Sequence, residues 1–290
     1  METLTLFSQI YPIWSAVLIL VFGMLIGSFL NVVIYRLPVM KKLAWHAEAR
    51  SVLELPEPDQ PIKAFNLVLP ASRCPHCGHQ IRAWENIPLL SYLWLRGRCS
   101  NCQSRISPRY PTIEVATGLL TVLTIHFIGL NSAGLWASVL VWVLIAAAMI
   151  DFDHLLLFDE LTLPLMWLGL VLNFYGVFTT LEDALLGAIL GYLSLWSVFH
   201  SFRLITGKEG FGYGDFKLLA ALGAWMGWQA IPLIIMLSSF AGAVIGGGLI
   251  MFGRDHSKPI PFGPYLAIAG IIALLWGGAI ADAYLQYVSQ

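Results

Sequence analysis

Charged residues are scarce in this sequence: Asp, Glu, Lys and Arg make up only 11% of its 290 residues, whereas hydrophobic residues make up 58%. Soluble domains carry about 25% charged residues. A chain with a mean hydropathy of +0.75 cannot hide so much apolar surface from water. The composition therefore excludes a water-soluble protein and predicts an all-α polytopic membrane protein surrounded by membrane lipid. The net charge of −1 says nothing about an acidic or basic partner, because the distribution of the charges matters here rather than their sum. We expect no nucleic-acid partner.

Long polar stretches are rare as well. Apolar runs that approach the roughly 20 residues of a membrane-spanning helix recur with short polar breaks between them. The two runs around Pro232 could form two short helices joined by a tight turn or one broken helix, and the sequence favours neither. In total we expect about eight transmembrane helices, at residues 11–35, 111–130, 135–150, 161–178, 184–205, 216–228, 231–252 and 265–281.

Lys and Arg are absent from the predicted helix ends on one side of the membrane. Eleven of the sixteen basic residues lie between the first two spans, and with eight spans the other five fall on the same side of the membrane. The positive-inside rule therefore places the large first loop in the cytoplasm and both termini in the periplasm. No basic residue precedes the first span and no small-residue cleavage site follows it, so we interpret it as an anchor rather than a signal peptide.

This topology predicts three segments: a first anchor at residues 1–35, a cytoplasmic zinc-binding domain at 36–110, and a membrane core at 111–290. Residues 56–61 are rich in proline and are typical of an exposed linker. Within the anchor, Gly27, Ser28 and Asn31 form a small polar face at helical spacing. We interpret this face as a helix-packing surface rather than a substrate contact.

Cysteine is equally rare, and all four cysteines belong to the predicted cytoplasmic segment: Cys74, Cys77, Cys99 and Cys102. Two Cys-x-x-Cys pairs can place four thiolates around one tetrahedral metal, as in zinc ribbons, although the gap of residues 78–98 is slightly longer than usual. The alternatives are two disulfides, which a cytoplasmic location disfavours, and a redox pair, which two matched motifs disfavour. We therefore predict a structural zinc site. His76 and His79 are spare candidate ligands that are more typical of surface residues.

Acidic residues cluster at predicted helix ends on the cytoplasmic side. Asp151 lies on the last turn of the third span, where the helix dipole disfavours an anion, and Asp215 opens the sixth, where the dipole favours one. Two carboxylates in unequal settings can share one proton, as in aspartic proteases. One then activates water while the other polarises the peptide carbonyl. The alternating glycines at residues 210–214 would leave room for an extended substrate strand.

Other interpretations of these acids were considered. A dinucleotide site requires GxGxxG after a β-strand, whereas residues 210–214 have GxGxG between membrane helices. Asp151 and Asp153 could instead hold a divalent metal in a membrane transferase that acts on phosphate-linked substrates. Lys208, Lys217 and His154 would then serve the phosphates. A transporter is disfavoured because its acids would be expected near mid-span. Asp159 and Glu160 are more typical of helix caps.

Several long stretches carry a resemblance to a known family. They are GSFLNVV (27–33), CPHCGHQIRAWENIPLLSYLWLRGRCSNC (74–102), ISPRYPTIE (106–114), IDFDHLLLFDELTLP (150–164), TGKEGFGYGDFKLLAALGAWMGW (206–228) and PIPFGPYLAIAG (259–270). In these stretches, and essentially end to end, the sequence resembles bacterial type IV prepilin peptidases. These are bifunctional leader peptidases and N-methyltransferases that also serve type II secretion.

The resemblance implies an inner-membrane aspartic peptidase that cuts the basic cytoplasmic leader of prepilins and pseudopilins after glycine. It also implies methylation of the new N-terminal residue, usually Phe, with S-adenosyl-L-methionine. By motif, Asp151 and Asp215 are the catalytic pair and the four cysteines are the zinc site. The residues that bind the methyl donor are not assigned. Where the family usually has Pro, Phe158 precedes Asp159, which alters the turn but neither catalytic acid.

Overall fold

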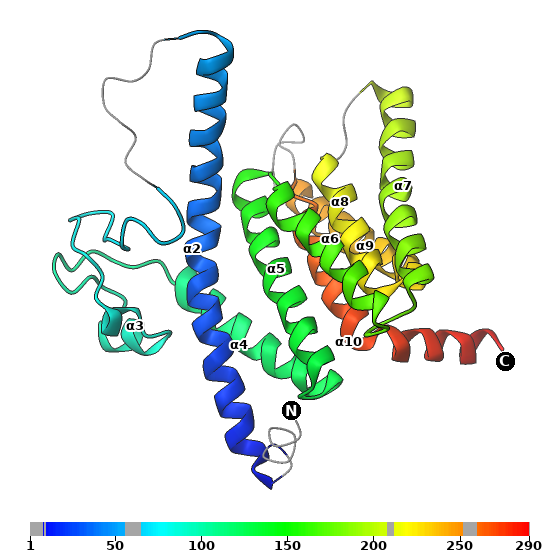
Figure 1. Ribbon diagram of the computed structural model, residues 1–290, viewed down its shortest axis with the longest axis horizontal. Helices are drawn as coiled ribbons and strands as arrows, with labels where there is room; N and C mark the ends of the chain where they lie inside the picture. Colours follow the sequence, from blue (N-terminus) through cyan, green and yellow to red (C-terminus); the bar gives the residue numbers. More distant parts are fainter. Residues whose placement is uncertain (1–7, 9, 56–64, 208–211, 252–259, 290) are drawn as a thin grey trace. The chain divides into compact units, whose positions relative to one another are not determined.

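A computed structural model describes residues 8, 10–55, 65–207, 212–251 and 260–289 (Figure 1). The chain divides into two compact units, Met1–His126 and Phe127–Gln290. The described residues are helical or irregular, and their only β pairing consists of two isolated bridges. The predicted all-α class is therefore confirmed for this part of the chain.

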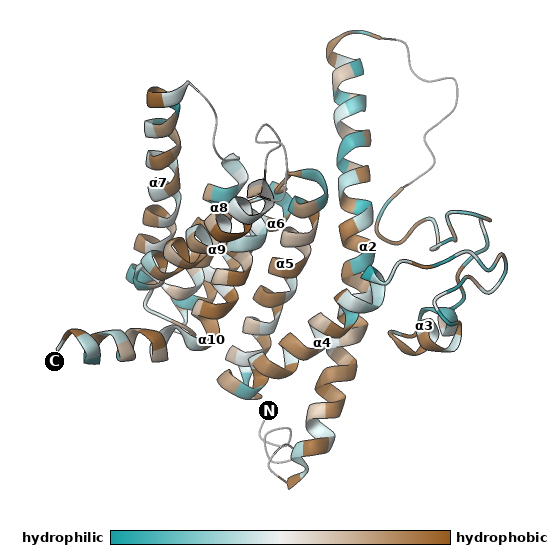
Figure 2. Ribbon diagram, turned by 180° about the vertical axis from the view of Figure 1, so that it is seen from behind, coloured by the Kyte–Doolittle hydropathy of each residue, from teal (hydrophilic) through white to brown (hydrophobic). Residues whose placement is uncertain are grey.

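The first unit is built around one long helix, α2 (Pro12–Val52), of 41 residues. The predicted anchor ends at residue 35, but the helix continues through Pro38 to Val52, because the residues beyond are mostly Ala, Leu, Lys, Arg, Met and Glu, which are good helix formers. At 1.5 Å per residue α2 is about 60 Å long, twice the hydrocarbon thickness of a bilayer. Figure 2 shows apolar residues along one half of α2 and hydrophilic residues along the other, so only part of it suits lipid.

Helix α4 (Arg109–Ile128) packs closely against α2 within this unit. A Cβ on Gly27 would lie only 2.8 Å from the Cα of Glu114, so the missing side chain permits the approach. Ser28 is buried beside it, and the Asn31 amide donates a hydrogen bond of 3.1 Å to the carbonyl of Tyr110. The interpretation of the small polar face as a packing surface is confirmed. The remaining elements of the unit are the short turns η1 (Ala83–Asn86) and α3 (Leu90–Trp94).

The second unit is a bundle of helices (Figure 1). Its elements are α5 (Ser132–His154), α6 (Asp159–Phe174), α7 (Leu181–Thr206), α8 (Tyr213–Met226), η2 (Trp228–Ala230), α9 (Ile231–Met251) and α10 (Gly263–Val288). Every one of the eight predicted spans contains a helix. Among the described residues, however, six helices are long and apolar enough to cross a membrane. Helices α6 and α8, with 16 and 14 residues, are shorter than the roughly 20 residues that a perpendicular span needs.

The region around Pro232 forms two helices rather than one broken helix. Helix α8 ends at Met226, and Gly227 follows with φ 82°, a left-handed conformation that favours glycine. Pro232 is the second residue of α9. A backbone N–H at that position has no acceptor within the helix, so proline, which lacks the N–H, costs no hydrogen bond there.

Helix α8 forms the centre of the second unit because it is apolar on all sides. Phe216, Leu219, Leu222 and Trp225 are fully buried, and α6, α7 and α10 pack around them. Helix α7 approaches the backbone of α8 closely, since Gly187 packs directly on Gly223 and a Cβ on Gly191 would lie 2.7 Å from the carbonyl oxygen of Leu219. The packing holds the start of α8, and with it Asp215, in a fixed position.

A buried asparagine, Asn173, binds the C-terminal end of α8, at the opposite end of that helix from Asp215. The Asn173 amide donates hydrogen bonds to the carbonyls of Ala224 (2.8 Å) and Trp225 (3.0 Å). Its carbonyl oxygen accepts from the backbone N–H groups of Phe178 (3.0 Å) and Thr179 (3.1 Å). All the hydrogen-bonding capacity of this side chain is therefore used inside the protein.

We expect Asn173→Leu to lower the free energy of unfolding by about 3 kcal/mol, because buried backbone groups lose their partners. The measurement is the midpoint of unfolding in detergent, monitored through tryptophan fluorescence. Gln286→Leu, at an exposed position of α10, is the control and should leave the midpoint unchanged. Equal midpoints for the two variants would contradict the assignment.

Candidate active site and metal centre

Asp151 and Asp215 are brought together in the second unit, although they are far apart in the sequence. Asp151 lies on the last turn of α5 and Asp215 on the first turn of α8. Each carboxylate is only 6% exposed, and the two are close enough for their charges to interact. The structure thus places in one site the two acids that the sequence analysis selected.

The Asp151 carboxylate is held by the start of another helix. Its Oδ2 accepts a buried hydrogen bond of 2.9 Å from the backbone N–H of Gly263, the first residue of α10. Sequence reasoning missed Gly263, which lies inside the quoted stretch 259–270. The available signal was the sequence Phe-Gly-Pro: glycine followed by proline at the start of an apolar run is typical of a helix N-terminus.

The Asp215 carboxylate is tied to its own helix start. Its Oδ2 accepts a hydrogen bond of 3.1 Å from the N–H of Gly212, the N-cap of α8. Its Oδ1 is buried and has no hydrogen-bond partner among the described residues. An unpaired buried oxygen of this kind is costly, so it marks a position that a proton, water or substrate group would satisfy.

The glycines before Asp215 have different surroundings. A Cβ on Gly214 would lie 2.5 Å from the Cβ of Leu157, so packing against the α5–α6 connection already requires glycine there. Only ordinary contacts surround Gly212. Gly210 lies outside the described residues. For Gly214 the expected clearance for a substrate strand is therefore not the reason for the glycine.

The remaining acids do not join this pair. Asp153 is exposed, and residues two apart on a helix point in different directions, so α5 does not present it beside Asp151. Asp159, in the first turn of α6, forms a salt bridge of 2.6 Å with Lys217. The geometry gives the Asp151–Asp153 metal site no support. Of its other candidate residues, His154 is the half-buried last residue of α5, and Lys208 lies outside the described residues.

The four cysteines of the first unit form a cluster with the dimensions of a zinc site. All four sulfurs lie within 4.8 Å of one another. The Sγ–Sγ distance is 3.8 Å between Cys74 and Cys102 and 4.0 Å between Cys77 and Cys99. A tetrahedral zinc with bonds of about 2.3 Å would separate its sulfurs by about 3.8 Å. In the described part of the chain this is the one group of three or more potential ligands that could hold a metal.

The surroundings of two of the four cysteines, Cys74 and Cys102, favour the thiolate. At Cys99, burial and the neighbouring cysteine thiols instead raise the pKa, despite backbone N–H groups that point at its sulfur. Backbone N–H groups of Cys77 and His76 point at Cys74 and lower the pKa of its thiol to about 6. The Ser104 hydroxyl, 3.1 Å from the sulfur of Cys102, lowers the pKa of that thiol. Thiolate is the form that binds metal. The chemistry of the donor set therefore fits a structural zinc ion.

Neither spare histidine belongs to the cluster. His79 Nε2 lies 3.3 Å from the Glu85 carboxylate, which also accepts a hydrogen bond from the N–H of Arg82. These contacts hold the loop after the first cysteine pair. His76 is exposed. His76 is thus a surface residue, as the sequence analysis favoured, whereas His79 is half-buried beside Glu85.

Comparison with known proteins agrees with this geometry. A family model described as "Bacterial Peptidase A24 N-terminal domain" matches residues 21–128, and one described as "Type IV leader peptidase family" matches residues 138–247. A "Prepilin leader peptidase/N-methyltransferase" of Stutzerimonas stutzeri is 58% identical over 278 residues, which cover 95% of this chain and 96% of the relative. The chain belongs to the type IV leader peptidase family. The resemblance and the enzyme class that it implied are confirmed.

Other members of the family are nearly as similar. Proteins of the same printed name from Aeromonas hydrophila and Pseudomonas aeruginosa are 56% and 55% identical, over 92% and 96% of this chain and 93% and 96% of their own lengths. No solved structure matches the chain.

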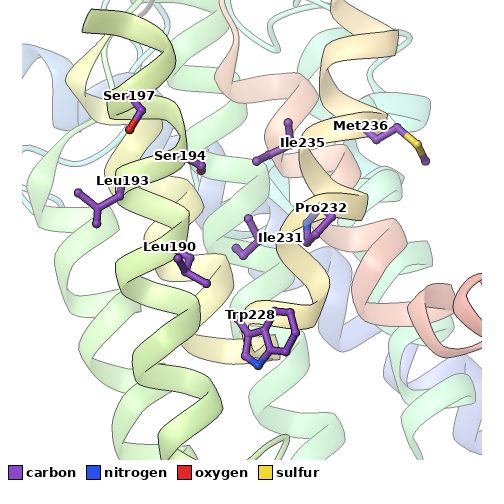
Figure 3. Close-up of a pocket in the computed structure, with 9 residues that line it drawn as sticks. All are labelled: Leu190, Leu193, Ser194, Ser197, Trp228, Ile231, Pro232, Ile235 and Met236. Carbon is purple, nitrogen blue, oxygen red and sulfur yellow. The ribbon is translucent and has the colours of Figure 1, made fainter. Parts of the chain in front are cut away.

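An apolar groove of about 580 Å³ lies between α7 and α9 of this leader peptidase (Figure 3). Leu190 of α7 and Ile231 and Ile235 of α9 lie on opposite sides of it, and Trp228 lies at one end. Neither candidate catalytic acid lines the groove. It is thus a feature of the apolar surface of the bundle and is separate from the site of Asp151 and Asp215.

Proposed function

We propose that this chain cleaves the basic leader of type IV prepilins and of type II secretion pseudopilins after glycine, with Asp151 and Asp215 as the catalytic pair. The observation that carries the proposal is the pairing of two buried, electrostatically interacting carboxylates, one of which has an unpaired oxygen. The name printed for the relatives, prepilin leader peptidase/N-methyltransferase, supports the same reaction.

The two carboxyl groups divide the chemistry of hydrolysis between them. One is protonated and donates a hydrogen bond to the carbonyl oxygen of the scissile peptide. The other, as carboxylate, takes a proton from a water molecule whose oxygen attacks the carbonyl carbon. The tetrahedral intermediate then collapses, the C–N bond breaks, and the amine leaves with a proton from the pair. A proton on Asp215 Oδ1 would also satisfy the buried oxygen that lacks a partner.

The proposed setting is the cytoplasmic face of the bacterial inner membrane. Asp151 ends α5 and Asp215 begins α8, three helices later, so alternating helix directions put both acids at one end of the second unit. We propose that all eight helices cross the membrane, with both termini periplasmic and residues 36–110 as the cytoplasmic zinc-binding domain. A prepilin whose leader is cytoplasmic would then present its cleavage site to the acids.

The second proposed activity is methylation of the new N-terminal residue, usually Phe, with S-adenosyl-L-methionine as donor. Methyl transfer requires a bound cofactor, and no strand–loop–helix unit that would hold it occurs among the described residues. No residue is therefore assigned to the methyl donor. The proposal rests on the family and on the printed names of the relatives.

The test is incubation of the purified protein with a synthetic prepilin in detergent, with and without S-adenosyl-L-methionine, followed by mass spectrometry. We expect loss of the leader in both samples and one added methyl group on the mature product only when the donor is present. An uncut prepilin would overturn the peptidase proposal, and a cut but unmethylated product would overturn the methyltransferase proposal.

Acidic residues near the site are proposed to attract the basic leader. Asp153 is exposed at the end of α5; Glu209, also proposed for this role, lies outside the described residues. We expect Asp153→Asn combined with Glu209→Gln to raise KM about threefold at low salt, because each exposed charge contributes little. The difference should vanish at high salt, where screening is strong. An unchanged KM at low salt would contradict this role.

A further inference from the structure

We infer that Gly263 is a positioning residue for the catalytic pair: its backbone N–H holds Asp151 Oδ2 so that the other oxygen stays available for the reaction. The inference rests on the proposed aspartic peptidase function and adds a residue to it. The primary observation is the buried hydrogen bond of 2.9 Å from Gly263 N to Asp151 Oδ2. Because the acceptor is a carboxylate, such a bond is charge-assisted and orients the group strongly.

Glycine is required at this position by the carboxylate and not by the backbone. Gly263 is not among the glycines with positive φ, so its backbone conformation would accept other residues. Glycine is in fact a poor residue inside a helix. A Cβ at Gly263, however, would lie 2.7 Å from Oδ2, 3.1 Å from Cγ and 3.2 Å from Cβ of Asp151. Any side chain would push the carboxylate out of place.

Helix α10 is well placed to set the geometry of the whole pair. It packs against both α5, which carries Asp151, and α8, which carries Asp215. Its second residue is Pro264, whose fixed φ holds the first turn, and the N-terminal end of the helix dipole favours a carboxylate.

The two acids are held in the same way. Asp151 Oδ2 accepts from Gly263 at the start of α10, and Asp215 Oδ2 accepts from Gly212 at the start of α8. In each case one carboxylate oxygen is fixed by a glycine N–H. For Asp215 the other oxygen, Oδ1, is the buried one without a partner. This arrangement directs the remaining oxygens to the shared proton and the substrate.

The test compares four variants of the full chain on one prepilin substrate in detergent: Gly263→Ala, Pro264→Ala, Gly270→Ala and Asp151→Asn. Gly270 is the matched control, since it lies on the same helix and a Cβ there would also approach a neighbour to 2.7 Å, but this neighbour is the apolar Leu222. The readouts are kcat, KM and the unfolding midpoint.

We expect Gly263→Ala to lower kcat by about 10²-fold at unchanged KM, since a displacement of about 1 Å can cost that much. Gly270→Ala should keep the kcat of the unchanged protein, although its unfolding midpoint falls as far as that of Gly263→Ala. Pro264→Ala, which removes the fixed φ without adding an atom near Asp151, should lower kcat less than Gly263→Ala does, again at unchanged KM.

Equal kcat values for Gly263→Ala and Gly270→Ala would overturn the positioning role. If Gly263→Ala does not accumulate, Pro264→Ala decides: a lower kcat than Gly270→Ala supports the role, and an equal kcat overturns it. Asp151→Asn separates the two proposals. If it still cleaves, the proposed function fails; if it is inactive while Gly263→Ala is fully active, only the positioning role fails.

Discussion

Asp151→Asn and Asp215→Asn are each expected to abolish prepilin cleavage while the protein still inserts into the membrane. An amide cannot accept the proton of the attacking water, and it cannot share one proton with the remaining carboxylate. Loss of one member of a catalytic unit typically removes most of its effect, so we expect kcat to fall by about 10⁴-fold or more. The measurement is the rate of leader release from a synthetic prepilin in detergent.

Asp153→Asn is the matched control. It makes the same chemical change two residues from Asp151, on the exposed side of the same helix end. It should retain a kcat near that of the unchanged protein. Full cleavage by either Asp151→Asn or Asp215→Asn would refute the catalytic pair.

The alternative of a metal-dependent transferase is separated by chelation. A divalent-metal chelator, used under conditions that leave the cysteine cluster loaded, should not affect cleavage by two carboxyl groups. It should inactivate an enzyme that holds its metal with Asp151 and Asp153. Loss of activity under these conditions would favour the metal site.

Replacement of Cys74 or Cys99 by serine is expected to release zinc and unfold the residues around the cluster. Both cysteines are buried, and the region between residues 65 and 107 has little regular structure besides η1 and α3. Structural zinc binding contributes about 10–16 kcal/mol in zinc-finger peptides, so a metal can supply most of the folding free energy of such a segment. The measurements are metal content of the purified protein and protease sensitivity of this segment.

His76→Ala provides the control for the cysteine variants. His76 lies between Cys74 and Cys77 but is exposed, so its loss should leave metal content and protease resistance unchanged. Full metal content in Cys74→Ser or Cys99→Ser would contradict the proposed zinc site. Loss of zinc from His76→Ala would show that the ligand set is wrong.

Much of the helical architecture could be predicted because it depends on local composition. The apolar runs located eight helices of the described residues, and the two Cys-x-x-Cys motifs located the four sulfurs that the structure brings within 4.8 Å. The end of α2 was less predictable, since the segment up to Val52 is polar yet remains helical. Hydropathy predicts how much of a helix can lie in the membrane. The end of the helix itself depends on helix propensity, which stays high after the apolar residues stop.

The details of the site were predictable only in part. Asp151 could be selected because the dipole disfavours an acid in the last turn of a helix, and Asp215 because it follows a glycine-rich approach to a helix start. Gly263 could not be selected, because its role depends on the packing of α10 against α5. Asn173 was also missed. A single asparagine in an apolar run gives no sign of which backbone groups it satisfies, and two of its partners lie 51 and 52 positions away.

The sequence by itself determined the membrane class, the positions of the helices, the two Cys-x-x-Cys pairs of the candidate metal site and the presence of acids at helix ends. These properties follow from composition and from spacings of a few residues. Only the tertiary structure decided that Asp151 lies close enough to Asp215 for their charges to interact. It also decided that the backbone N–H of Gly263, 112 positions from Asp151, donates a hydrogen bond to the Asp151 carboxylate. Such contacts depend on how whole helices pack, because a hydrogen bond requires atoms to be placed within a few tenths of an ångström.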